Sequence, residues 1–147
     1  MTRFALLFLS LIFTLSAATA GPNDARHRQW LKEMQQAKLE FFIRELAITA
    51  DQKAQFTRTF NDMENELITL RDNVASLRRT IRDKANPTDL DYEKAAEAQF
   101  ELSQREGAIQ LKYFAKYKTF LTKKQLFEYQ RVEHRWMKKV MQSRKKK

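Results

Sequence analysis

Hydrophobic residues recur through the middle of the chain with the spacing of one helical face. They follow one another in alternating steps of four and three residues, a period of about 3.5 that is typical of a helix packed along its length against another helix. The stripe consists of Phe56, Phe60, Met63, Leu67, Leu70, Val74, Leu77 and Ile81. The pattern predicts a helix from Ala50 to Lys84, about 50 Å long. Such a helix needs an antiparallel neighbour or a second subunit to cover its stripe.

A turn and a second long helix are expected next. In the sequence Asn-Pro-Thr-Asp at residues 86–89, the proline disfavours helical backbone at the residue before it, and the threonine or the aspartate can cap a new helix. That helix is expected from about Asp91 to Thr119, and the short connection predicts an antiparallel hairpin. Gly107 within it either permits a close helix approach or a bend, or is a tolerated surface glycine. Three apolar residues of this helix are displaced from its main face: Phe100, Leu111 and Phe114.

Shorter helices are expected on either side of the hairpin, from about Arg28 to Leu46 and from Lys123 to about Gln142. The whole chain holds only two glycines and two prolines, and it has no alternating β-branched run that would predict a strand. The predicted fold class is therefore all-α, with four helices built around a long central antiparallel hairpin. No low-complexity linker separates the helices, so residues 21–147 are expected to form one domain with a basic C-terminal tail.

One short motif occurs twice, each time where a helix is expected to begin. Ile-Thr-Ala-Asp-Gln at residues 48–52 returns as Leu-Thr-Lys-Lys-Gln at residues 121–125. In a capping box, the threonine hydroxyl accepts from the backbone N–H three residues on, and the glutamine side chain accepts from the threonine N–H. Each cap contributes about 1 kcal/mol. We interpret as helix-capping residues Ile48, Thr49, Gln52, Leu121, Thr122 and Gln125.

The first twenty residues have the pattern of a secretory signal. Arg3 precedes a short apolar run, and Ala-Thr-Ala at residues 18–20 is a small-residue cleavage site. We expect cleavage after Ala20 and export across the inner membrane; the alternative is an uncleaved N-terminal anchor. The sequence has no second apolar segment, so we expect no stable membrane insertion. The exported chain has no cysteine, which excludes disulfides, thiol chemistry and cysteine metal sites.

Positive charge is concentrated in the last third of the chain. The formal net charge is +10, and residues 104–147 hold 14 of the basic side chains but only 3 of the acidic ones. A basic surface of this kind attracts acidic proteins, anionic lipid or nucleic acid. Export makes nucleic acid the weakest of the three, and we expect no nucleic-acid partner.

Catalysis and metal binding have little support in the sequence. His27 and His134 are the only histidines, and no nucleophile lies at a recognisable triad spacing. The chain has no Gly-rich phosphate loop and no HxxxH spacing. We therefore expect no enzyme, no cofactor and no metal site; the alternative is a metal site made by one histidine with carboxylates across a dimer.

The paired motifs, in an exported all-helical chain without cysteine, resemble the LTxxQ proteins of the Spy/CpxP family. The resemblance covers most of residues 28–142, through FFIRELAITADQKAQF at the first corner and FLTKKQLFEYQRVEHRW at the second; Ile48 departs from the leucine of the motif. It implies a thin α-hairpin with flanking helices, paired into an elongated curved homodimer in the periplasm. Family members are ATP-independent chaperones, envelope-stress regulators or metal-resistance proteins.

The resemblance implies a chaperone, or holdase, that binds unfolded or misfolded envelope proteins. The alternatives are an envelope-stress regulator that docks on the periplasmic domain of a sensor kinase, and a metal-resistance relative. A further reading is membrane-surface attachment by the last helix through Trp136 and Met137. Client binding needs apolar side chains beside long basic ones. Several of the aromatic candidates named next can equally lie in the core. The candidate client-binding residues are Arg78, Arg79, Arg82, Phe100, Phe114, Lys116, Tyr117, Lys118, Trp136, Lys138 and Lys139.

Overall fold

The fold is all-α, as the sequence predicts. In the computed structural model, the described residues, 22–144, form four helices: α1 (Pro22–Glu45), α2 (Ala50–Arg82), α3 (Asp89–Tyr117) and α4 (Lys123–Arg144). The predicted signal segment and the last three lysines lie outside the described residues. The predicted boundaries agree to within two residues, except that α1 begins six residues earlier than expected.

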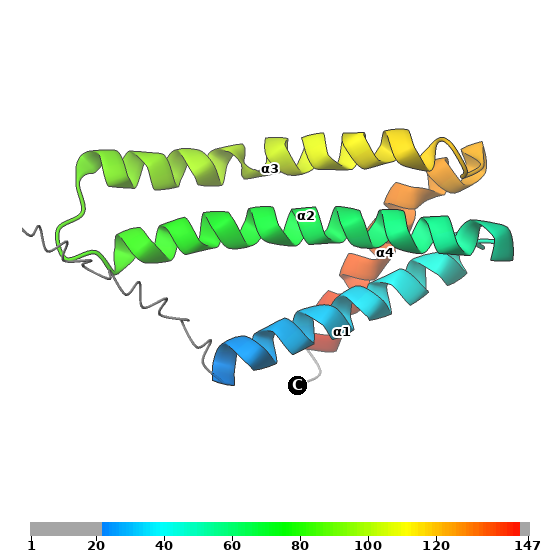
Figure 1. Ribbon diagram of the computed structural model, residues 1–147, viewed down its shortest axis with the longest axis horizontal. Helices are drawn as coiled ribbons and strands as arrows, with labels where there is room; N and C mark the ends of the chain where they lie inside the picture. The colour runs from blue at the N-terminus through cyan, green and yellow to red at the C-terminus, as the bar shows by residue number, and fades with distance from the viewer. Residues whose placement is uncertain (1–21, 145–147) are drawn as a thin grey trace, which may run out of the picture.

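The hairpin of α2 and α3 is the long axis of the molecule (Figure 1). The two helices run antiparallel, side by side, while α1 folds back beneath α2 and α4 crosses to pack on α1. All four helices meet near the two corners that carry the repeated motif, and the α2–α3 loop lies at the opposite end. We call residues 69–107 the arm, and residues 22–68 and 108–144 the body.

The hydrophobic stripe of α2 is covered within the chain. Seven of its eight residues are buried and Leu77 is half-buried. Because α3 covers the arm and α1 joins it in the body, this stripe needs no second subunit. The stripe is therefore no argument for a homodimer.

An aromatic core holds the body together. Phe42, fully buried, lies with its ring centroid 5.3 Å from that of Phe60 and 5.0 Å from that of Tyr129. Tyr117 and Trp136 belong to the same core and are only 3% and 8% exposed. Both are candidates for a client-binding surface, and burial corrects the prediction for Trp136, which packs between helices. Tyr117 is buried between helices as well, and only one side of it lines the groove described below.

The two capping motifs are confirmed, and they contact each other. Thr49 and Gln52 form one capping box, and Thr122 and Gln125 form the other. The two glutamine side chains also exchange hydrogen bonds, with N–O distances of 3.0 and 2.9 Å. The Gln52 amide further donates to the Phe120 carbonyl, and the Gln125 amide to the Leu46 carbonyl. Each glutamine therefore caps its own helix and also binds the end of the preceding segment at the other corner.

The end of α1 carries a local strain. Ala47 has a φ of 48°, in the left-handed region where glycine is favoured. Its N–H donates to the Arg44 carbonyl, and the Ile48 N–H donates to the Ile43 carbonyl. These two bonds make a Schellman motif, in which glycine is the usual residue at the position of Ala47. The sharp reversal brings Ile48 back onto the core, where it is half-buried.

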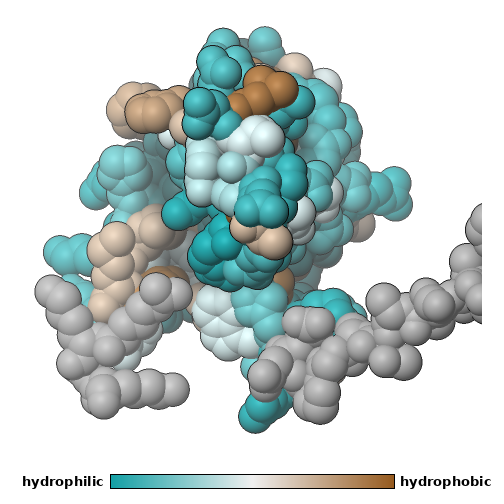
Figure 2. Space-filling view, turned by 90° about the vertical axis from the view of Figure 1, so that its left-hand side faces the viewer, coloured by the Kyte–Doolittle hydropathy of each residue, from teal (hydrophilic) through white to brown (hydrophobic). Residues whose placement is uncertain are grey.

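The far end of the arm is held by a third capping box. Thr88, rather than Asp89, is the cap of α3, with Asp91 as its partner. Hydrogen bonds from Lys84 and Thr88 lower the pKa of Asp91 to about 2. Figure 2 looks at this end of the molecule, where hydrophobic residues lie in separate patches among hydrophilic ones. The end is thus closed by polar contacts and not by a core.

Candidate binding groove

A groove of about 390 Å³ opens in the body where α4 separates from the α2–α3 hairpin. All four helices contribute to it, and most of its walls are apolar. The apolar side chains that line it are Met63, Leu67, Leu111, Phe114, Tyr117, Leu126 and Tyr129. Gly107 lies on the α3 wall, and no atom would contact a Cβ built on it. The glycine therefore does not serve a close helix approach, and its missing side chain leaves the groove open.

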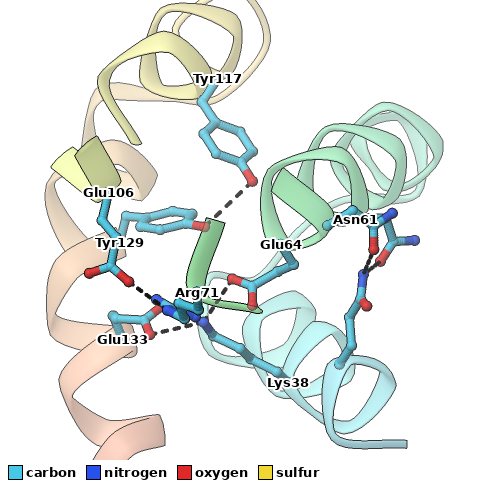
Figure 3. A network of polar contacts seen from close by, with 10 residues as sticks. Lys38, Asn61, Glu64, Arg71, Glu106, Tyr117, Tyr129 and Glu133 are labelled. Carbon is cyan, nitrogen blue, oxygen red and sulfur yellow. Dashed lines mark hydrogen bonds and ion pairs between the residues drawn. The ribbon is translucent and has the colours of Figure 1, made fainter. Parts of the chain in front are cut away.

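Each charged residue that lines the groove is paired, and Arg71 pairs with Glu106 on α3. The Lys38 amine, from α1, lies 2.8 Å from a carboxylate oxygen of Glu64 on α2 and 2.9 Å from one of Glu133 on α4 (Figure 3). The Lys38 and Glu64 side chains are only 13% and 8% exposed. A buried charge is tolerated only when it is paired in this way. The ion cluster thus joins three helices.

Two tyrosine hydroxyls meet beside this cluster. The hydroxyl oxygens of Tyr117 and Tyr129 lie 3.4 Å apart (Figure 3). Burial raises the pKa of both phenols well above the usual value. Both hydroxyls therefore stay protonated at neutral pH and act as hydrogen-bonding groups.

The rim of the groove on α3 combines apolar and basic side chains. Leu111 is 70% exposed and Phe114 is 41% exposed. One lysine, Lys118, lies at this rim, with its amine 5.6 Å from the ring centroid of Phe114. By helical spacing, Lys112 and Lys116 lie on the opposite side of α3, where the Lys116 amine is 4.4 Å from the ring centroid of Tyr113. A single long basic side chain thus lies over the exposed ring of the rim.

The Lys112 amine makes close polar contacts on the other side of the hairpin. It pairs with both carboxylate oxygens of Glu66, which also accepts from the Tyr113 hydroxyl. The hydrogen bond from Lys112 lowers the pKa of Glu66, whereas burial and the adjacent carboxylate raise the pKa of Tyr113 to about 12. These contacts join α2 to α3 away from the groove, and Lys118 is the lysine of α3 beside it.

The structure divides the predicted client-binding residues among several places. Phe114 and Tyr117 line the groove, Tyr117 as a buried wall, and Lys118 lies beside Phe114 at its rim. The other eight lie elsewhere, with Lys116 on the opposite side of α3 beside Tyr113. Phe100 is 88% exposed on the arm, and Trp136 is in the core. The three arginines lie near the end of α2 in the arm, and the remaining two residues lie on α4: Arg78, Arg79, Arg82, Lys138 and Lys139.

Several groove residues were not predicted. Leu111 had a signal in the sequence, because it lies off the main face of its helix together with Phe114. Met63 and Leu67 were assigned only to the helix–helix stripe, although each also faces the groove. Lys38, Glu64 and Glu133 have no signal at all, since their meeting depends on how α1 and α4 cross.

The groove has the chemistry of a binding surface. Every buried side-chain nitrogen or oxygen in the described part of the chain has a hydrogen-bond partner. Within the same residues, no three histidine, cysteine or acidic side chains are grouped as they would be to hold a metal ion. None of the helices between residues 22 and 144 combines the length and hydrophobicity needed to span a bilayer. What the groove presents to a ligand is apolar surface with Lys118 beside it.

Comparison of the chain with models of protein families, with curated proteins and with solved structures finds no match.

Proposed function

We propose that this protein is an ATP-independent periplasmic chaperone that holds unfolded segments of envelope proteins in the groove between α3 and α4. One observation carries the proposal: Leu111 and Phe114 stay exposed beside an apolar groove while every charge inside it is already paired. An exposed apolar surface with a polar rim is a mark of an interaction site. The resemblance to the Spy/CpxP proteins supports the same function.

Apolar contact suits a partner without a fixed structure. Burial of hydrophobic surface is non-directional and contributes about 25 cal/mol per Å², so many sequences can occupy the same groove. Lys118 adds attraction for acidic segments, which accelerates encounter and is screened by salt. No step of such binding needs a nucleotide, a metal or a catalytic group.

Self-association and export belong to the same proposal. The homodimer rests on the family resemblance, since the α2 stripe is covered within the chain. Sedimentation velocity of residues 21–147 at micromolar concentration tests it, and a monomer across that range would remove the dimer without affecting the groove. Fractionation of cells, with detection in the periplasm of a chain that starts at Gly21, tests the export.

The test of chaperone function is light scattering from a chemically unfolded client that aggregates on dilution, with residues 21–147 added and no ATP. We expect suppression near stoichiometry, stronger at low salt than at high salt. A double variant, Leu111→Ser with Phe114→Ser, is expected to lose most of this suppression because it removes the apolar rim.

A matched control and a blocking variant make the test specific to the groove. Leu90→Ser changes another exposed leucine of α3, 55% exposed at the far end of the arm, and is expected to leave suppression unchanged. Gly107→Leu places a side chain in the open space of the groove and replaces a helix-interior glycine, which costs about 1 kcal/mol relative to alanine. It is expected to be at least as stable as the parent and yet to bind clients poorly.

Absence of suppression with several unrelated clients would contradict the proposal. In that case the groove would fit one folded partner, as in the regulator alternative, and a screen with the periplasmic domains of sensor kinases would follow. Equal loss in the Leu90→Ser and Leu111→Ser/Phe114→Ser variants would contradict the location of the site.

A further inference from the structure

The outer face of α4 carries a second exposed apolar surface, separate from the groove. Phe127 is 82% exposed, Met137 is 46% exposed and Met141 is 58% exposed. They are separated by ten and four residues, so they lie on one side of the helix. The opposite side buries Val132 and Trp136 in the core. None of the three exposed side chains lines the groove.

Basic side chains flank this apolar face. The α4 segment holds seven lysines and arginines and only two acidic residues. By helical spacing, Lys124, Arg131 and Lys138 line one border of this face, and Lys123 lies in line with Met141 at the start of the helix. All four are exposed.

The two acidic residues of α4 do not cancel this charge. Glu133 points to the groove, where it pairs with Lys38 at 2.9 Å. Glu128 lies 3.4 Å from Arg131 at the edge of the face. Three further lysines, at 145–147, follow in the sequence. The outer face of α4 therefore carries Phe127, Met137 and Met141, with the exposed Gln130 and His134 between them, and is positive along one border and at its start.

We propose that this face docks on a bilayer that contains anionic phospholipid, with α4 lying parallel to the membrane surface. A helix that binds in this way has an apolar face with lysine and arginine beside it, and it draws on both hydrophobic burial and charge. The charge complementarity favours anionic headgroups. Because Phe127 and Met141 are about 20 Å apart on a single convex helix, a continuous surface can accept them together, whereas a small ligand cannot.

This docking differs from the attachment expected from the sequence. That expectation relied on Trp136, which the structure buries, and on Met137, which it leaves exposed. The docking places Phe127 and Met141 in the headgroup region instead. The attachment is peripheral, and it does not depend on the groove or on the chaperone proposal.

The test is flotation of residues 21–147, which contain all four helices, with vesicles of two compositions. One is pure phosphatidylcholine, and the other contains about one third phosphatidylglycerol. We expect binding to the anionic vesicles that weakens as salt is raised, and little binding to the neutral ones. Each basic residue near an anionic surface contributes about 1 kcal/mol, so the double variant Lys124→Gln/Lys138→Gln is expected to lower affinity about thirtyfold.

A pair of phenylalanine variants isolates the helix face. Phe127→Ser and Phe100→Ser each replace a phenylalanine that is more than 80% exposed, so neither removes core packing. We expect Phe127→Ser to weaken binding to the anionic vesicles about tenfold, and Phe100→Ser to leave it unchanged. Far-ultraviolet circular dichroism serves as the control that checks whether both variants keep their helices.

A third variant, Lys145→Gln/Lys146→Gln/Lys147→Gln, measures the contribution of the tail. If binding depends on these three lysines and not on Phe127, the proposal is overturned in favour of a simple polybasic tail. It is also overturned if neutral and anionic vesicles bind equally, or if neither binds. Binding to acidic proteins or nucleic acid without binding to anionic vesicles would show that the face serves another polyanion and would likewise overturn it.

Discussion

The body and the arm use the same α2 helix in two different ways. In the body, α2 packs among three other helices, and its residues Phe56, Phe60, Met63 and Leu67 join a continuous aromatic and aliphatic core. In the arm, α2 buries Leu70, Val74 and Ile81 against α3 alone. The hydrophobic stripe is equally regular in both regions. The difference therefore comes from the number of helices that cover it.

In the arm, α3 buries less apolar surface than it does in the body. The only fully buried residues of α3 are Tyr113 and Tyr117, both in the body. Between Asp89 and Gly107 its inner positions are small or half-buried, including Ala95, Ala98 and Leu102. Small side chains let two helices pack closely but remove little apolar area from water. The body is thus the part that holds the fold, and the arm is a two-helix extension of lower local stability.

A pair of leucine truncations tests this comparison with the largest expected effect. Leu67 and Leu70 are neighbours on the same stripe, 3% and 6% exposed, but only Leu67 belongs to the main core. We expect Leu67→Ala to lower the free energy of unfolding by about 4 kcal/mol and Leu70→Ala by about 2 kcal/mol, because the arm relaxes around a cavity more easily. Urea denaturation followed by circular dichroism measures both. Equal losses would show that the arm is packed as tightly as the body.

The corners provide a second comparison, for which we expect losses of unfolding free energy of intermediate size. Gln125→Ala removes the cap of α4 and the cross-links to Gln52 and to the Leu46 carbonyl, so we expect a loss of about 2 kcal/mol. Thr88→Ala at the arm corner removes only a local cap and is expected to cost about 1 kcal/mol. A double-mutant cycle between Gln52 and Gln125 is expected to show positive coupling. Additive losses would mean that the two corners act independently.

Two alanine–glycine exchanges give the smallest expected effects. Ala47→Gly relieves the left-handed backbone of the body corner and is expected to stabilise the protein by about 1 kcal/mol. Gly107→Ala, at the border of the arm, adds a Cβ to open space within a helix and is also expected to gain about 1 kcal/mol. Thermal unfolding measures both. A loss of stability at Gly107 would show that its backbone is under a constraint that the helix geometry does not reveal.

The candidate site was predictable only where its residues also leave a local pattern. Phe114 and Lys118 are recognisable because they belong to an apolar and basic stretch of one helix. Tyr117 belongs to the same stretch of sequence but is buried, since α4 returns over it and brings Tyr129 within 3.4 Å. Trp136 was misplaced for the same reason: its exposure depends on α1, which supplies Phe41 at a ring distance of 5.5 Å.

The sequence by itself determined the four helices, the hairpin and the two capping boxes. These depend on neighbours within about one turn, where side-chain spacing and cap chemistry decide the backbone. Only the tertiary structure decided that the two capping glutamines bind each other, 73 residues apart, and that Lys38 bridges Glu64 and Glu133. It also decided that the aromatic residues Tyr117 and Trp136 became core, whereas Phe100 and Phe127 stayed on the surface. Those outcomes depend on how helices cross, and the crossing is a property of the packed chain as a whole.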